Sequence, residues 1–251
     1  MRWAEVIEAI LRENKGVASL ESLYQGVSKY RSPLPAGDWQ KTLRGVLYRE
    51  VRRGRFIKVG LGVYALPERP PAKTSAYTYA LEGKSAKAYL SQLSDPHSAI
   101  EGMLIEIGNF MEYLTYTCDQ NRFFDGKRLG DLCRLQQVPP FTYPDLQSLV
   151  ARCDVVWFGR TQQPFPKFIY EVEATTDFTN SLLKMYQLLD FNARFILVAP
   201  EKRRALFEQR LQQAPFAQVR HRFAFRPFEQ VARFYFSCVE HYELRADFLS
   251  D

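Results

Sequence analysis

The sequence predicts an α/β protein in which a small helical N-terminal module precedes a larger mixed sheet flanked by helices. Three observations predict this class. Three segments of helical periodicity and a hairpin pattern occupy residues 1–67, a proline-rich stretch follows them, and the order strand, strand, helix, strand runs from residue 154 to residue 200. With 251 residues, 46% of them hydrophobic and 25% charged, the chain is long enough for two domains of unequal size.

The first module begins with three short helices. The first helix has apolar residues at helical spacing, namely Trp3, Val6, Ile7, Ile10 and Leu11. Ser19 can cap a second helix over residues 20–28, because its hydroxyl can accept a bond from a free amide of the first turn. Asp38 can cap a third helix, which begins at Trp39 and ends at Gly54.

A hairpin follows the three helices. The letters RFIKVGLGVYAL form two short β runs around Gly60 and Gly62. Three helices followed by a hairpin is the order of a winged helix-turn-helix, whose third helix enters the major groove of DNA. The letters GRFIKVGLGVYAL also resemble the HARE-type winged helix, a module often fused to restriction endonucleases. The resemblance implies double-stranded DNA as the partner of this module.

The charge of the chain supports a nucleic-acid contact by the N-terminal module. Residues 1–67 carry 12 Lys and Arg against 6 Asp and Glu, a surplus equal to the +6 of the whole chain. Such asymmetry is typical of a module that binds an anionic partner. The candidate DNA-binding residues on the third helix and the adjoining strand are Lys41, Arg44, Arg49, Arg52, Arg53, Arg55 and Lys58. The alternative is a module that binds another protein.

A linker separates the two expected domains. The stretch from Pro67 to Ala80, PERPPAKTSAYTYA, has three prolines and no apolar period, which is typical of a semi-rigid linker. We therefore expect a winged helix-turn-helix domain over residues 1–67, a linker over 68–94 and a second domain over 95–251.

Several classes of protein are disfavoured. No stretch approaches the roughly 18 uninterrupted apolar residues of a membrane span, and the N-terminal residues lack the pattern of a secretory signal. The cysteines match no CxxC metal spacing and are expected to be reduced thiols: Cys118, Cys133, Cys153 and Cys238. These observations predict a cytoplasmic protein.

A strong helical pattern opens the second domain. Ser98 can cap this helix, with Glu101 in the capping-box position three residues later. Glu101 and Glu106 are five residues apart and cannot point the same way, so one is expected to face a site and the other solvent.

The sheet of the second domain is predicted by five β-rich runs. LTYTCD is a short strand, and DVVWF and FIYEVEA form an antiparallel pair around the turn-rich letters GRTQQPFPK. FTNSLLKMYQLLDF has a helical period, and RFILVAP is typical of a buried strand in a parallel sheet. QVRHRFAFRPF is expected to form an edge strand, and the segment from Phe228 on a closing helix.

Three carboxylates interrupt the apolar strands. Asp154 opens one strand of the antiparallel pair, while Glu171 and Glu173 are two residues apart and share a face of the other strand. An unpaired carboxylate inside a strand is costly to bury. Three of them on one sheet face would repel each other without a cation, and Mg²⁺ or Mn²⁺ prefers such oxygen ligands.

Residues 95–200 resemble the PD-(D/E)xK nuclease superfamily, the restriction-endonuclease-like fold. Its pattern is a helix glutamate, an aspartate at a strand start, (D/E)xK on the next strand, and then a helix and a strand. The resemblance implies that Asp154 is the motif aspartate, Glu171 the motif acid and Glu101 the helix glutamate, and that these three hold the metal. Leu104, three residues after Glu101, fits the apolar position of the helix pattern.

The motif lysine is missing, because its position falls on Glu173. Some restriction enzymes of this superfamily carry ExE and remain active, so that Glu173 can serve as a general base. Alternatively, Lys184 on the following helix supplies the missing cation, and Glu106 is the fallback for the helix glutamate. The histidines lie outside any metal-ligand spacing and are expected to be solvated or hydrogen-bonded: His97, His221 and His241.

Each of these residues also has a purely structural alternative. Glu171 and Glu173 can be exposed on an edge strand, and Asp154 can cap a turn. Glu101 can be no more than a capping-box acid, and Lys184 a surface lysine.

The first hypothesis for function is a divalent-metal-dependent DNA endonuclease, with a homodimer expected because both strands of a duplex must be cut. The second is a DNA-binding regulator whose nuclease-like domain is inactive, which the missing motif lysine supports. A nuclease that acts on RNA is a third possibility.

Overall fold

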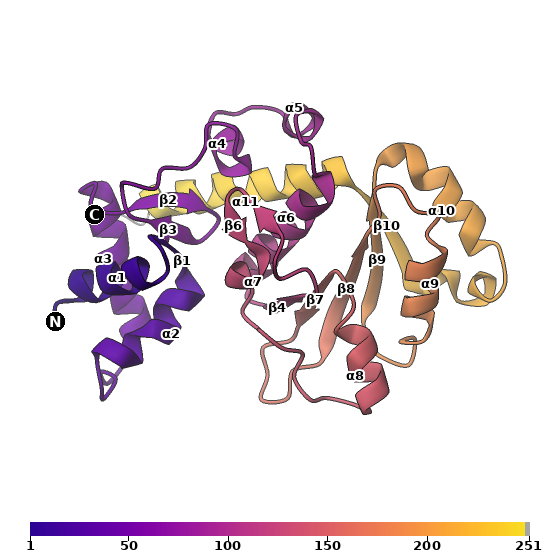
Figure 1. The fold of residues 1–251 in the computed structure, drawn as a ribbon, viewed down its shortest axis with the longest axis horizontal. Helices are drawn as coiled ribbons and strands as arrows, with labels where there is room; N and C mark the ends of the chain where they lie inside the picture. The colour runs from indigo at the N-terminus through magenta and orange to yellow at the C-terminus, as the bar shows by residue number, and fades with distance from the viewer. Residues whose placement is uncertain (249–251) are drawn as a thin grey trace. The chain divides into compact units, whose positions relative to one another are not determined.

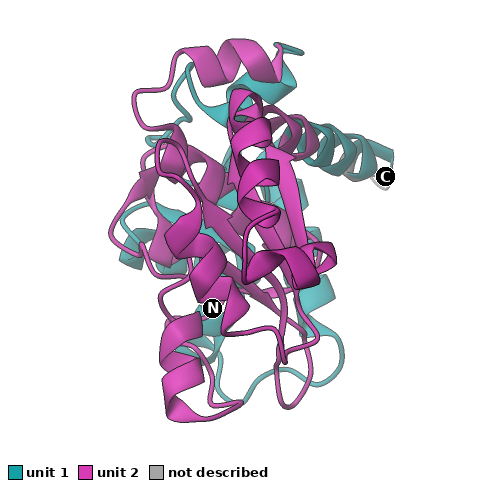
Figure 2. Ribbon diagram, turned by 90° about the vertical axis from the view of Figure 1, so that its right-hand side faces the viewer, with its two compact units in different colours: residues 1–84, 236–251 teal, residues 85–235 magenta. Residues whose placement is uncertain are grey.

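The computed structural model describes residues 1–248, which form two compact units (Figures 1 and 2). Unit 1 contains residues 1–84 and the described residues from Phe236 on, and unit 2 contains residues 85–235. The last helix, α11 (Phe228–Phe248), therefore contributes its first third to unit 2 and the rest to unit 1. Over residues 1–248, none of the helices combines the length and the apolarity that a membrane crossing requires.

Unit 1 is built on helices and a small sheet. Its elements are α1 (Trp3–Glu13), β1 (Val17–Ser19), α2 (Leu20–Tyr30), α3 (Trp39–Arg52), β2 (Ile57–Gly60), β3 (Val63–Ala65) and α4 (Ala76–Leu81). The strands are antiparallel in the order β1-β3-β2, which confirms the hairpin and adds β1 as an unexpected third strand. The predicted caps are confirmed: Ser19 Oγ accepts from the Ser22 amide at 3.1 Å, and Asp38 Oδ1 from the Lys41 amide at 2.9 Å. Side chains of all three helices and the sheet fill the core, among them Val6, Ile7, Ile10, Leu23, Val27, Leu43, Leu47, Phe56 and Tyr64.

The C-terminal part of α11 makes polar contacts with residues of β2, β3 and α4 in unit 1. Glu243 accepts hydrogen bonds from Lys58 Nζ at 2.6 Å and from the Tyr77 hydroxyl at 2.6 Å. The Tyr242 and Tyr64 hydroxyls share a hydrogen bond. The domain expected over residues 95–251 therefore differs from the structure at its C-terminal end, because these partners lie 166 to 185 residues earlier in the chain.

The expected linker also differs from the structure. Residues 68–94 contain α4 and α5 (Ala86–Ser91), which are capped by Ser75 and Ser85. Each serine hydroxyl accepts from an amide of the first helical turn at 3.1 Å, and the two helices bury Tyr77 and Tyr89. The two caps and the two buried tyrosines give the segment the local stability that the proline content does not predict.

Unit 2 is organised around a mixed five-stranded sheet of order β10-β9-β8-β7-β4 (Figure 1). The strands are β4 (Leu114–Thr117), β7 (Val155–Phe158), β8 (Pro166–Val172), β9 (Arg194–Ala199) and β10 (Phe223–Pro227). β7 is antiparallel to β4 and β8, whereas β9 is parallel to β8 and β10. The predicted antiparallel pair, the buried parallel strand and the edge strand are all confirmed.

Helices cover both faces of this sheet. On one face, α8 (Pro144–Val150), α9 (Thr179–Tyr186) and α10 (Arg204–Leu211) cover a large apolar core with Val156 and Phe158 of β7. Because side chains alternate along a strand, Trp157 points to the opposite face. There its Nε1 donates to the Leu104 carbonyl of α6 (Pro96–Phe110) at 3.1 Å. The predicted class, α/β with a helical N-terminal part and a mixed sheet flanked by helices, is confirmed.

The remaining elements of unit 2 are short. They are β5 (Phe123–Phe124), β6 (Lys127–Arg128), α7 (Leu129–Leu132), η1 (Glu201–Arg203) and η2 (Phe216–Arg222). The β5–β6 hairpin packs closely on α6, where a Cβ on Gly102 would lie 2.2 Å from the Phe124 ring. Neither this hairpin nor α8 is predicted from the sequence.

Candidate functional site

Helix α6 brings a histidine and a glutamate onto one helical face. The helix begins one turn earlier than predicted: its cap is Asp95, whose Oδ1 accepts from the Ser98 amide at 3.2 Å, with Pro96 at the first position. The prediction of Ser98 as the cap is therefore wrong, and with it the capping-box alternative for Glu101. Since His97 lies four residues before Glu101, both side chains point to the same side.

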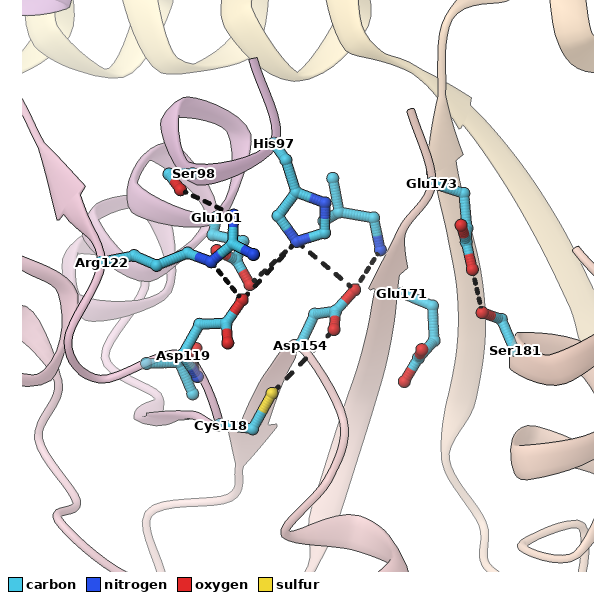
Figure 3. A network of polar contacts seen from close by, with 12 residues as sticks. His97, Ser98, Glu101, Cys118, Asp119, Arg122, Asp154, Glu171, Glu173 and Ser181 are labelled. Atoms are coloured by element: carbon cyan, nitrogen blue, oxygen red, sulfur yellow. Dashed lines mark hydrogen bonds and ion pairs between the residues drawn. The ribbon is translucent and has the colours of Figure 1, made fainter. Parts of the chain in front are cut away.

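His97 Nε2 lies among three carboxylates (Figure 3). It is 3.4 Å from Glu101 Oε1, 3.8 Å from Asp119 Oδ2 and 4.0 Å from Asp154 Oδ2. Asp119 follows the end of β4 and Asp154 precedes the start of β7, so the antiparallel pairing of these strands brings both acids to one edge of the sheet. We call His97, Glu101, Asp119 and Asp154 the acidic cluster.

Glu101 is buried without a hydrogen bond. Its side chain has no exposed surface, and neither carboxylate oxygen has a hydrogen-bond partner among the described residues. His97 Nε2 is buried and lacks a hydrogen bond in the same way. Burial raises the pKa of Glu101 to about 7, although the nearby imidazole lowers it. A buried polar group without a hydrogen bond lowers the stability of the fold by about 1–3 kcal/mol, and by more when it is charged. A further positive partner in the cluster would therefore be stabilising.

Asp154 is oriented by backbone and side-chain donors. Its Oδ2 accepts from the Val172 amide at 2.6 Å, and Cys118 Sγ lies 4.0 Å from its Oδ1. Burial raises the pKa of Asp154, even though the amide bond favours its charged form. Burial and the same carboxylate raise the pKa of Cys118 to about 12, so this thiol is protonated at neutral pH.

Glu171 and Lys184 form a buried ion pair next to the cluster. Lys184 Nζ, on α9, donates to both Glu171 oxygens at 2.8 Å and to the Arg152 carbonyl at 2.8 Å. Burial and the charge of Asp154 raise the pKa of Glu171 to about 7, against the effect of Lys184. Burial alone would lower the pKa of Lys184, but the Glu171 carboxylate raises it, so the lysine stays charged.

Glu173 lies directly after the end of β8 and is held by hydroxyl groups. Its carboxylate accepts a hydrogen bond from Ser181 of α9 (Figure 3) and another from Thr176. Arg203 donates to its backbone carbonyl at 3.1 Å. Both Glu171 and Glu173 therefore contact side chains of α9, which is consistent with their expected common face.

Glu106 is buried. The expectation that one of the two helix acids faces solvent is therefore wrong. Lys127 Nζ donates to its Oε1 at 2.6 Å, and the Tyr235 hydroxyl donates to its Oε2 at 2.6 Å. Glu106 thus has a complete set of partners, whereas Glu101 on the same helix has none of comparable quality. Of the two, Glu101 faces the acidic cluster.

Within residues 1–248, the acidic cluster has fewer positively charged side chains as partners than it has carboxylates. Arg122 pairs with Asp119 at 2.9 Å and lies 3.7 Å from Asp95. Burial alone would lower the pKa of His97, but Glu101 and Asp154 raise it above its ordinary value. Lys184 forms its ion pair with Glu171. Among the described residues, the His97 imidazole is therefore the nearest positive charge that remains for Glu101 and Asp154.

The structure brings together most of the predicted site residues and adds three that the sequence analysis missed. Glu101 and Asp154 belong to the acidic cluster, and the register of β7 with β8 continues from Val155 and Tyr170 to place Asp154 opposite Glu171. The missed residues are His97, Asp119 and Arg122. The four-residue spacing of a histidine and a glutamate on one helix was the available signal for the first of them.

The candidate DNA-binding residues of unit 1 differ in their surroundings. Lys41, Arg49 and Arg52 lie on α3 and are exposed. Contacts within the unit involve at least four of the candidates: Arg44 donates to the Tyr24 hydroxyl at 2.9 Å, Arg53 pairs with Glu50 at 2.9 Å, Arg55 with Glu8 at 2.8 Å, and Lys58 with Glu243 at 2.6 Å. Lys58 is the most enclosed of the three candidates that form these ion pairs, with 12% of its side chain exposed.

Comparison with known proteins finds one family for most of the chain. The model of the family described as the type II restriction enzyme NmeDI C-terminal domain matches residues 80–248. The match includes every residue of the acidic cluster and the Glu171–Lys184 pair, and it leaves residues 1–79 outside. No curated protein and no solved structure matches the chain.

Proposed function

Because the chain belongs to the family of the type II restriction enzyme NmeDI C-terminal domain, we propose that it is a divalent-metal-dependent DNA endonuclease that hydrolyses phosphodiester bonds. The observation that carries this proposal is the state of Glu101. A fully buried carboxylate without a hydrogen bond, beside Asp154, is the donor set that a hard cation such as Mg²⁺ or Mn²⁺ binds. The residues at the site therefore fit such an ion.

Asp154, Glu171 and Glu101 would hold the metal ion. A bound divalent ion activates water and stabilises the charge that develops on the phosphate. The Val172 amide fixes one oxygen of Asp154, and Lys184 fixes the carboxylate of Glu171, so two of these acids are oriented before an ion binds. Lys184 would also place a positive charge close to the scissile phosphate.

Glu173 would orient or deprotonate the attacking water. Hydrogen bonds from Thr176 and Ser181 keep its carboxylate in one position. In its charged form this carboxylate can accept a proton from the water. The role of the motif lysine would then be divided between Glu173, as the base, and Lys184, as the cation.

The order of the elements supports membership of unit 2 in the PD-(D/E)xK superfamily. A helix with Glu101, a strand that starts after Asp154, a strand with Glu171, the helix α9 and the strand β9 follow each other along the chain. This is the succession expected from the motif, with Lys184 on the helix in place of a lysine on the strand.

Unit 1 would bind double-stranded DNA as a winged helix. Three helices and a three-stranded antiparallel sheet support this assignment. Lys41, Arg49 and Arg52, which are exposed on α3, would contact phosphates. Hydrolysis of both strands would require two sites, so we propose that the active form is a homodimer.

A second candidate function is a DNA-binding regulator with an inactive nuclease-like domain. It is favoured by the acid at the motif lysine position, Glu173, whose carboxylate is already occupied by two hydroxyl groups. The unpartnered Glu101 argues against it, because an inactive domain gains no stability from such a group.

Incubation of supercoiled plasmid with the purified full chain tests the proposal. Cleavage in Mg²⁺ or Mn²⁺ is expected for the wild type and for Glu208→Ala, which removes an exposed acid on α10. No cleavage is expected for Asp154→Ala or Glu171→Ala, provided that circular dichroism shows them folded. If the wild type binds duplex DNA but leaves it intact in both metals, the regulator is the correct assignment. Parallel reactions with RNA test the third possibility.

A further inference from the structure

We infer that His97 is a direct ligand of the divalent cation, together with Glu101 and Asp119, and that the site therefore prefers a transition ion such as Mn²⁺ over Mg²⁺. This inference deepens the proposed function, because it names the ion and a nitrogen ligand at the same site. It rests on the proposed function only in assuming that a cation binds there.

The spacing of the donor atoms suits a shared ion better than a shared proton. A hydrogen bond requires about 2.7–3.2 Å between heavy atoms, whereas His97 Nε2 is 3.4 Å from Glu101, 3.8 Å from Asp119 and 4.0 Å from Asp154. Ligands about 2.1 Å from one ion are about 3.0 to 4.2 Å apart, depending on the angle between them. All three separations fall within that interval.

The distance between the Glu101 and Asp119 ligand atoms also comes close to this interval. The possible ligand atoms of His97, Glu101 and Asp119 lie within 4.8 Å of one another. Glu101 has no hydrogen bond that would have to break for its carboxylate to turn toward an ion. Asp119 faces His97 with Oδ2, the oxygen that also pairs with Arg122 at 2.9 Å, so Arg122 would hold this carboxylate in place while it binds the ion.

Hydrogen bonding of the imidazole does not account for the arrangement. A proton on Nε2 could serve only one of the three carboxylates, and it serves none with hydrogen-bond geometry. Without that proton, the Nε2 lone pair would face carboxylate oxygens and be repelled by them. A cation in the cluster turns the same lone pair into a favourable ligand, since neutral imidazole is a common metal ligand.

The identity of the donors decides the choice of ion. Mg²⁺ is a hard ion that binds oxygen and keeps several waters, whereas imidazole nitrogen suits first-row transition ions. Mn²⁺ accepts both carboxylate and imidazole ligands. A site with one nitrogen and two or three carboxylates should therefore bind Mn²⁺ more tightly than Mg²⁺.

Electron paramagnetic resonance of Mn²⁺ bound to the full chain tests the inference. Titration of the free Mn²⁺ signal measures affinity, and pulsed spectra of the bound ion show a ¹⁴N coupling when imidazole is a ligand. The wild type is expected to show saturable binding and this coupling. His221→Gln, which changes an exposed histidine outside the cluster, should show both as well.

His97→Gln is expected to lose the ¹⁴N coupling and to bind Mn²⁺ at least about tenfold more weakly, since even outer partners of metal ligands contribute 10–100-fold. Its affinity for Mg²⁺, measured by competition, should change less. Asp119→Asn keeps the inference testable if His97→Gln does not fold. It should bind Mn²⁺ more weakly and still show the coupling.

The outcomes separate this inference from the proposed function. Bound Mn²⁺ without a ¹⁴N coupling overturns the role of His97, and plasmid cleavage in the same preparation would leave the nuclease assignment intact. Absence of saturable Mn²⁺ binding also overturns the inference, and the contact of His97 with Glu101 is then an ion pair alone. A nitrogen-coupled Mn²⁺ in a protein that cleaves neither plasmid nor RNA supports the inference and refutes the nuclease.

Discussion

Replacement of Glu101 by glutamine is expected to stabilise the metal-free protein at neutral and alkaline pH. The folded protein holds this carboxyl with a pKa of about 7, while the ordinary value is 4.5. Above pH 7 both the folded and the unfolded chain carry the charge, but only the folded chain has to bury it. The carboxylate therefore opposes folding there, and the glutamine does not.

The magnitude follows from the two pKa values. A difference from 4.5 to about 7 corresponds to about 3 kcal/mol at about 1.4 kcal/mol per pKa unit. The amide of the introduced glutamine would also lack a partner, which reduces the gain, so we expect about 1–3 kcal/mol at pH 8. The gain should shrink between pH 7 and pH 4.5 and vanish below pH 4.5, where the glutamate is protonated in both states.

Urea unfolding of the full chain in EDTA, followed by circular dichroism from pH 4 to pH 8, measures this effect. Glu106→Gln is the matched control, because Glu106 is equally buried on the same helix but accepts from Lys127 and Tyr235. Its loss should destabilise the fold by about 3–5 kcal/mol. If Glu101→Gln destabilises the protein at pH 8 as Glu106→Gln does, Glu101 has a partner and the reasoning is refuted.

Three further changes test other parts of the account. Lys184→Met leaves Glu171 buried without its cation, so urea titration at pH 7 should show a loss of about 3 kcal/mol, and an unchanged value would mean that the pair is not formed. Gly102→Ala puts a Cβ 2.2 Å from the Phe124 ring and should cost about 1–3 kcal/mol in thermal unfolding; an unaltered Tm would show that the helix has room. Lys41→Ala, a change at an exposed residue of α3, should lower the slope of log Kd for duplex DNA against log salt by about 0.9 without affecting Tm, and an unaltered slope would exclude a phosphate contact.

The sheet of unit 2 was predictable because its signals are local. Alternation, turn residues and short apolar runs specify β7, β8 and β9, and the pairing of the first two follows from the short turn between them. The carboxylates at Asp154 and Glu171 stood out for the same reason, since each interrupts an apolar strand.

His97 is not predicted as a site residue because the expected start of α6 lies one helical turn too late. With Ser98 as the expected cap, His97 falls outside the helix and has no defined relation to Glu101. The structure uses Asp95 and Pro96 instead, which makes the spacing of His97 and Glu101 meaningful. An aspartate followed by proline is itself a helix-start signal, and a helix that begins there includes His97.

Other features depend on distant partners and could not have been predicted. The burial of Glu106 is stabilised by residues 21 and 129 positions away along the chain. The placement of Glu243 in unit 1 depends on Lys58, 185 positions earlier. The winged-helix assignment of residues 1–67 and its DNA contacts stay predictions.

The metal site can be located in a crystal of the full chain soaked in Mn²⁺, because anomalous scattering places the ion without assumptions about its ligands. We expect an anomalous peak within bonding distance of Glu101 and Asp154, with His97 beside it. A map without a peak among these residues, and with Glu101 still buried and unbound, would contradict this expectation.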